Sequence, residues 1–254
     1  MRRLAAVALS GLVLAAALVA AAPPSHAAAP KRTALLLGDS LTTETWPDFT
    51  APRGWRLTEY AYPGIAPCDW LTGRGANFYK QMASQHPKAV LLETAGNDAT
   101  ACMKVNGAFP AVGSTAYLAK YEQALATVFR VAARDGAVVV LLTPPPLLEP
   151  LLGPAMNQLM AWAHYQQHVD VALATRVALS VGGQFSLYLP CRRGETLRDG
   201  CAGGRIAVRT IDQTYHLHFC PYLKDFTPVF TCATYSSGQE RWATAAMQVL
   251  RGLK

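Results

Sequence analysis

A serine follows the first short apolar run of the chain that indicates a buried strand. Ala34–Leu37 leads directly into Gly38-Asp39-Ser40. This pattern predicts a strand that presents Ser40 at its carboxyl end, where ligands bind in α/β folds. A serine there acts as a nucleophile when a histidine and an electrophilic pocket lie within reach. The alternative is a turn in which Asp39 or Ser40 only caps the next helix.

Three further stretches carry residue types that such a nucleophile needs. They are a glycine after a proline, an asparagine in a Gly-Asn-Asp turn, and an acid followed by two histidines: Gly64, Asn97, and Asp212 with His216 and His218. An imidazole titrates near neutrality and can take the serine proton. A carboxylate holds that imidazole in the correct tautomer.

A developing oxyanion needs donors that are already in place, and the same motifs supply them. The candidates are the backbone N–H groups of Ser40 and Gly64 and the side-chain amide of Asn97. Taken alone, Asn97 also fits a left-handed turn and Gly64 an ordinary turn glycine. We expect Asp39 to brace the turn around Ser40 and not to serve as the acid of a triad.

Apolar runs alternate with helical patterns along the rest of the chain. Strands are expected at 34–37, 55–62, 89–93, 137–142 and 185–189, and helices at 73–86, 114–135, 154–181 and from 236 onward. In the second of these helices one apolar stripe is formed by Tyr117, Tyr121, Leu125 and Val128. Gly136 is expected to end that helix.

Fully apolar strands that alternate with helices are typical of a parallel sheet covered on both faces. We therefore expect one domain of the α/β class, a three-layer α/β/α sandwich with a central, mostly parallel sheet. The carboxyl ends of parallel strands share one edge. The motifs that follow the strands would meet there.

The first residues have the pattern of a secretory signal peptide. Arg2 and Arg3 precede a run of Ala, Leu and Val, and small residues follow Pro23-Pro24 up to Ala28. A retained membrane anchor is the competing interpretation. We expect residues 1–27 to be the signal peptide, 28–254 to be a single catalytic domain, and the protein to be secreted or held in the cell envelope.

Six cysteines in an exported chain predict disulfides. Neighbours in sequence favour Cys191–Cys201 and Cys220–Cys232, which leaves Cys68 to pair with Cys102, although other connectivities are possible. The rival hypothesis is a zinc site at His216, His218 and Cys220. Disulfides are favoured because thiols outside the cell normally oxidise and no Cys-x-x-Cys is present. We therefore expect no metal.

The net charge of +7 is modest for 254 residues, and the basic residues are scattered. No arginine-rich stripe with interleaved aromatic residues points to nucleic-acid binding. We expect at most peripheral contact with the cell envelope, and a monomer.

With these motifs in place, the chain resembles the SGNH (GDSL-type) hydrolase family, whose four blocks carry Ser, Gly, Asn and His in that order. The resemblance runs from about residue 33 to 250. Several stretches are similar to secreted actinobacterial members: Pro63–Trp70, Val208-Arg209, His218–Pro221 and Tyr235–Gly238. The resemblance implies the flavodoxin-like fold of that family and no cofactor.

The resemblance also implies the role of each site residue. Ser40 is the nucleophile, Asp212 the orienting acid, and Ser40, Gly64 and Asn97 form the oxyanion hole. The family usually places its acid three residues before the histidine, whereas Asp212 lies four before His216 and six before His218. The Phe-Cys-Pro after His218 resembles the family's continuation, so His218 is taken as the base and His216 as the reserve candidate.

The implied activity is that of a secreted serine esterase or lipase-like hydrolase, which cleaves a small-molecule, glycan or lipid ester through an acyl-enzyme on Ser40. An acyltransferase would pass the acyl group to a sugar or lipid hydroxyl with the same residues. A non-catalytic cell-envelope binding protein is the third alternative. The α/β-hydrolase elbow Gly-x-Ser-x-Gly is absent, because Leu41-Thr42 follows Ser40. The leucines at 147–148 and 151–152 are expected to pack against the core, with an acyl pocket as the alternative.

Overall fold

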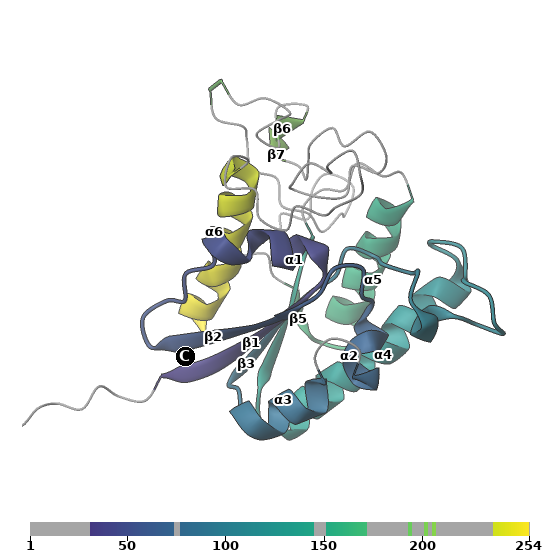
Figure 1. The fold of residues 1–254 in the computed structure, drawn as a ribbon, viewed down its shortest axis with the longest axis horizontal. Helices are drawn as coiled ribbons and strands as arrows, with labels where there is room; N and C mark the ends of the chain where they lie inside the picture. Colours follow the sequence, from purple (N-terminus) through teal and green to yellow (C-terminus); the bar gives the residue numbers. More distant parts are fainter. Residues whose placement is uncertain are drawn as a thin grey trace, which may run out of the picture. The chain divides into compact units, whose positions relative to one another are not determined.

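A five-stranded sheet organises the computed structural model, which describes residues 31–73, 77–144, 151–171, 193–194, 201–202, 205–206 and 236–253 (Figure 1). Its strands are β1 (Arg32–Gly38), β2 (Trp55–Ala61), β3 (Ala89–Glu93), β4 (Val138–Leu142) and β5 (Asp170–Val171). They pair in the order β2-β1-β3-β4-β5, and every pair is parallel. This is the flavodoxin-like order of a doubly wound sheet.

Helices cover both faces of the sheet. They are α1 (Ser40–Thr45), α2 (Pro67–Thr72), α3 (Phe78–Gln85), α4 (Thr115–Arg134), α5 (Leu152–Tyr165) and α6 (Ser236–Gly252). Because side chains alternate along a strand, Leu35 and Leu37 of β1 pack into a core with α2 to α5, whereas Leu36 packs into a second core with α1 and α6. The predicted three-layer α/β/α sandwich is confirmed.

The remaining described elements are short. The 3-10 turn η1 (Trp46–Asp48) follows α1, and η2 (Ala101–Met103) follows the loop after β3. Strand β6 (Cys201–Ala202) pairs antiparallel with β7 (Arg205–Ile206). None of the helices in the described part of the chain has both the length and the apolar character needed to cross a bilayer.

Helix α4 forms as its sequence predicts. The Ser114 hydroxyl caps its start by accepting from Tyr117 N, and the expected apolar stripe is fully buried at Tyr121, Leu125 and Val128. Gly136 follows the helix with φ of +72°, a conformation that glycine adopts without strain.

The helix expected at 154–181 is wrong at residues 166–171, and residues 172–181 lie outside the described residues. Helix α5 ends at Tyr165, His168 takes a φ of +54°, and Asp170–Val171 pairs with β4. Pairing with β4 satisfies the backbone of this segment in place of a further helical turn, so tertiary context overrides the helical pattern. The strand expected at 185–189 lies outside the described residues.

A helix that the sequence pattern does not predict forms at Pro67–Thr72. Pro67 begins α2, a position that tolerates proline because its missing N–H needs no partner there. The Asp69 carboxylate accepts from Ala66 N at 2.9 Å, which closes the first turn. The next helix, predicted from residue 73, begins at Phe78 with Asn77 as its cap.

Gly38 lets α1 pack tightly against the end of β1. A Cβ at this position would overlap the buried side chain of Thr42. We therefore expect Gly38→Ala to lower the free energy of unfolding in urea by about 1–3 kcal/mol. Gly252→Ala is the control, because an added Cβ meets nothing within 4 Å there, and its stability should equal that of wild type or exceed it by up to about 1 kcal/mol. Equal stability of the two variants would contradict the prediction.

Candidate functional site

The motifs that carry Ser40 and Asn97 follow two neighbouring strands of the sheet, β1 and β3. β1 and β3 pair in parallel with Leu37 opposite Leu92, so Gly38 and Glu93 end neighbouring strands at the same edge. Ser40, the first residue of α1, is 7% exposed there. The predicted nucleophile therefore lies beside the loop 94–98.

The Asp39 carboxylate ties these two segments together. Its Oδ1 accepts from Leu41 N at 3.0 Å within its own turn. Its Oδ2 accepts from Ala95 N at 2.7 Å and from Asn97 Nδ2 at 2.9 Å across the strand ends. The side chain is fully buried. The structure confirms the bracing role that the sequence predicts for Asp39.

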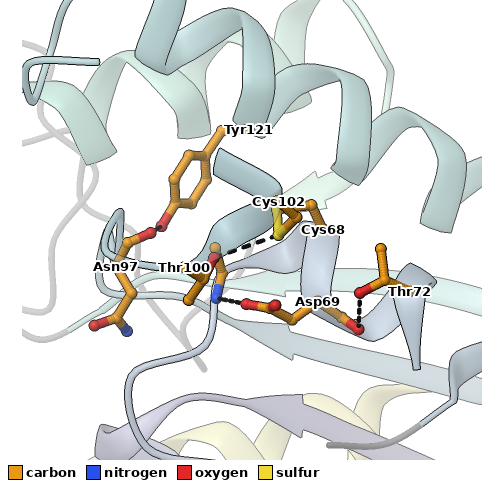
Figure 2. The surroundings of a disulfide bond; sticks show 8 residues. Cys68, Asp69, Thr72, Asn97, Thr100, Cys102 and Tyr121 are labelled. Atoms are coloured by element: carbon orange, nitrogen blue, oxygen red, sulfur yellow. Dashed lines mark hydrogen bonds between the residues drawn. A yellow bond between two sulfur atoms is a disulfide. The ribbon is translucent and has the colours of Figure 1, made fainter. Parts of the chain in front are cut away.

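Asn97 is held from both its side chain and its backbone. An amide nitrogen carries two hydrogens, and the bond to Asp39 uses one, so the second can donate to another acceptor. The Asn97 carbonyl accepts from the Tyr121 hydroxyl at 2.6 Å, and Figure 2 shows the amide group turned away from that ring. Asn97 is thus a fixed donor and not a left-handed turn residue; the positive φ, +98°, belongs to Gly96.

Gly96 is packed so closely that no side chain fits. A Cβ there would overlap Leu152 of α5 and would lie 2.9 Å from the Tyr117 hydroxyl, which donates to the Gly96 carbonyl at 2.8 Å. Tyr117 and Tyr121 of α4 have ring centroids 4.9 Å apart. Two adjacent aromatic rings therefore support successive carbonyls of the loop that carries Asn97.

Glu93 places a second carboxyl beneath the nucleophile turn. Its Oε2 accepts from the Thr42 hydroxyl at 2.9 Å and from Asp39 N at 3.3 Å. Its Oε1 is buried and has no hydrogen-bond partner among the described residues. Burial raises the pKa of the Glu93 carboxyl well above its usual range, and the nearby Asp39 raises it further. We infer that Asp39 carries the negative charge, because it accepts from three N–H groups.

A cavity of about 120 Å³ opens beside Ser40. Its described lining comes from the nucleophile, the loop after β3, one residue before α4 and the start of α5: Ser40, Ala95, Gly96, Asn97, Asp98, Val112 and Leu152. Asp98, which follows Asn97 in the Gly-Asn-Asp motif, also lines the cavity. Ser40 and Asn97 share the cavity, so a carbonyl bound in it can meet a nucleophile and an amide donor together.

Gly64 follows β2 with φ of +72° and is exposed. It is not among the described residues that line the cavity. Close to it along the chain, Cys68 of α2 forms a disulfide with Cys102 of η2, the pair that the sequence leaves after its other assignments (Figure 2). The bridge fixes the segment after Gly64 to the segment after Asn97.

The other predicted site residues lie outside the described residues. These are the candidate acid and bases and most of the remaining cysteines: Asp212, His216, His218, Cys191, Cys220 and Cys232. Cys201 belongs to β6, but its side chain is not described. The zinc alternative at His216, His218 and Cys220 therefore stays a sequence hypothesis. Of the leucines left open, Leu151 is 61% exposed, whereas Leu152 is buried and lines the cavity.

Sequence reasoning missed the residues that support the site from below. Glu93 is the only charged residue in the apolar run of β3, and that isolation is a signal that it has a specific partner. Tyr117 and Tyr121 were assigned to the core by their spacing. A tyrosine placed on a buried stripe needs a partner for its hydroxyl, which is the signal for their bonds to the loop.

Comparison with known proteins gives structural similarity alone. No family model and no curated protein matches the sequence. A Slackia heliotrinireducens protein assigned to the SGNH hydrolases aligns with a TM-score of 0.49 and 15% identity, over 87% of this chain and 100% of that one. A GDSL-like lipase from Bacteroides thetaiotaomicron aligns with a TM-score of 0.40 and 16% identity, over 55% of this chain and 67% of that one. A catalytic mutant of an acetylxylan esterase from Geobacillus stearothermophilus aligns with a TM-score of 0.40 and 14% identity. The alignment covers 58% of this chain and 77% of that one.

Glu93→Gln should change how stability depends on pH. A carboxyl whose pKa is raised by folding stabilises the protein fully below its unfolded pKa, near 4.5, and that contribution is lost as the pH rises. Glutamine cannot ionise. We therefore expect the stability of Glu93→Gln relative to wild type to increase between pH 5 and pH 8, with a slope of up to about 1.4 kcal/mol per pH unit.

Urea denaturation across this range measures the effect. Glu240→Gln, an exposed position of α6, is the matched control and should run parallel to wild type. A Glu93→Gln curve that is also parallel would show that Glu93 is ionised in the folded protein.

Tyr121→Phe should loosen the loop that carries Asn97. The variant keeps the buried ring and removes the donor to the Asn97 carbonyl. We expect a loss of about 0.5–1.5 kcal/mol in the free energy of unfolding. Tyr79→Phe is the control, because that ring is 44% exposed. If both variants match wild type in urea denaturation, the Tyr121 bond does not support the loop.

Proposed function

We propose that the chain is a serine hydrolase of carboxylic esters, of the SGNH type that its four motifs resemble. The observation that carries the proposal is the arrangement at the end of β1. Ser40 and Asn97 line one cavity, and the buried Asp39 joins the turn of the first to the amide of the second. A nucleophile and a fixed donor at one cavity are what acyl transfer requires.

Ser40 Oγ attacks the ester carbonyl carbon in this mechanism. The carbonyl oxygen becomes negative and is stabilised by the second N–H of the Asn97 amide and by the Ser40 backbone N–H. Gly64 is proposed as a further donor, because it follows β2, the other neighbour of β1. The tetrahedral intermediate expels the alcohol and leaves Ser40 acylated, and water then releases the acid.

The assignment of the catalytic base is supported by the sequence motif alone. His218 takes the Ser40 proton, gives it to the leaving alcohol, and then activates the water, with Asp212 orienting its ring. His216 is the reserve candidate. The chemistry assigned to these residues needs no metal and no organic cofactor.

We also place the activity outside the cytoplasm, in the extracellular space or the cell envelope. The Cys68–Cys102 disulfide supports this location, because such bonds persist in oxidising compartments. The charged and apolar pattern before Ala28 supports export as well.

Hydrolysis of p-nitrophenyl acetate tests the proposed roles. We expect Ser40→Ala to lower kcat by about 10⁴-fold or more, and Asn97→Ala by about 10²–10³-fold through the lost oxyanion donor. His218→Ala should lose activity and His216→Ala should keep it. Ser84→Ala, at an exposed serine of α3, is the matched control and should match wild type.

Different outcomes of these assays would indicate a different base or a different function. Full activity in Ser40→Ala would contradict the proposal, and loss only in His216→Ala would exchange the two histidines. An ester product in the presence of an added alcohol would identify an acyltransferase. A folded wild-type protein that binds esters without turnover would be a binding protein.

A further inference from the structure

The cavity beside Ser40 is small compared with the sites that hold large ligands. Its volume is about 120 Å³, whereas pockets for drug-sized ligands measure roughly 300–1,000 Å³. An apolar cavity of about 150 Å³ takes a single benzene-sized molecule. By this comparison the space beside Ser40 takes a group of about four carbons.

Three of the described lining residues are apolar. Val112 and Leu152 come from segments before α4 and at the start of α5, and Ala95 comes from the loop after β3. Leu152 is 7% exposed and is packed against Gly96. This contact fixes the position of the leucine in the cavity wall, because Tyr117 and Tyr121 of α4 hold the loop that contains Gly96.

An ester that reacts with Ser40 must place one of its two substituents in this space. The acyl part remains attached through both half-reactions, whereas the alcohol leaves after the first. Burial of each CH₂ against Val112 and Leu152 contributes about 0.8 kcal/mol, and that gain ends once the volume of about 120 Å³ is filled. Asp98 is among the lining residues, and an acidic residue beside the cavity disfavours an acyl chain that carries its own negative charge.

We propose that this cavity is the acyl pocket and that Leu152 and Val112 restrict the substrates to esters of short, uncharged acids, from acetyl to about butyryl. The inference rests on the proposed function and adds the substrate class. The alcohol part of the ester lies outside this cavity and is not restricted by these residues.

The test compares p-nitrophenyl esters of acetate, butyrate, octanoate and succinate. Wild type should show kcat/KM at least about tenfold higher for acetate or butyrate than for octanoate or succinate. Leu152→Ala and Val112→Ala should each raise the octanoate-to-butyrate ratio by about tenfold, since each removed CH₂ or methyl group relieves a clash worth about 1.4 kcal/mol or more. Neither variant should change the relative rates of acetate esters of different alcohols.

Leu159→Ala is the matched control. Leu159 lies on the same helix, is fully buried and packs in the core of α4 and α5, so this variant is destabilised without opening the cavity. Its chain-length preference should equal that of wild type. A shift of equal size in Leu159→Ala would show that Leu152 acts through stability and would overturn the inference.

Failure of the inference and failure of the proposed function give different results. Activity that depends on Ser40 but favours octanoate over butyrate in wild type, or that changes with the alcohol in Leu152→Ala, overturns the acyl pocket alone. No hydrolysis of any ester by folded wild type and folded Leu152→Ala overturns the proposed function and the acyl pocket together.

Discussion

The site depends on a buried carboxylate that accepts three N–H groups from two segments. Asp39 is fully buried, and a charge in such a place is tolerated only when it is well hydrogen-bonded. Leu41 N, Ala95 N and Asn97 Nδ2 supply those bonds at 2.7–3.0 Å. These donors come from the segments that follow β1 and β3. Their hydrogen bonds to Asp39 therefore fix the turn that carries Ser40 relative to the side-chain amide of Asn97.

The carboxyl of Glu93 lies beneath the same turn and determines which of the two buried acids carries the negative charge. Asp39 and Glu93 lie side by side in the interior, and two buried charges of one sign repel. Glu93 accepts from Asp39 N and the Thr42 hydroxyl with one oxygen, and burial raises its pKa. The raised pKa favours the neutral form of the Glu93 carboxyl, which leaves the negative charge on Asp39, where the N–H donors converge.

The sequence predicts the parts of this fold that follow from periodicity. Residues 34–37 of β1 and 89–92 of β3 form unbroken apolar runs, and α4 has one clear apolar stripe, so their types and their burial follow from local pattern. The helix predicted at 154–181 is present up to Tyr165 and is wrong at Asp170–Val171, because their pairing with β4 is a contact between distant segments. No local pattern encodes that pairing.

The site divides in the same way. Ser40, Asn97 and the bracing role of Asp39 follow from short motifs at strand ends. The contribution of Leu152 to the cavity depends on how α5 packs against Gly96, and the bonds from Tyr117 and Tyr121 depend on how α4 packs beneath the loop. Those residues are recognised only when the elements are placed in space.

Covalent labelling of the folded, disulfide-bonded protein with a fluorophosphonate tests the central claim most directly, because the reagent phosphonylates an activated serine. Intact mass and peptide mapping would locate the adduct. The account predicts one phosphonyl group, on the peptide that carries Ser40, and none in Ser40→Ala. An adduct on another residue, or an unlabelled folded protein, would contradict the claim that Ser40 is an activated nucleophile.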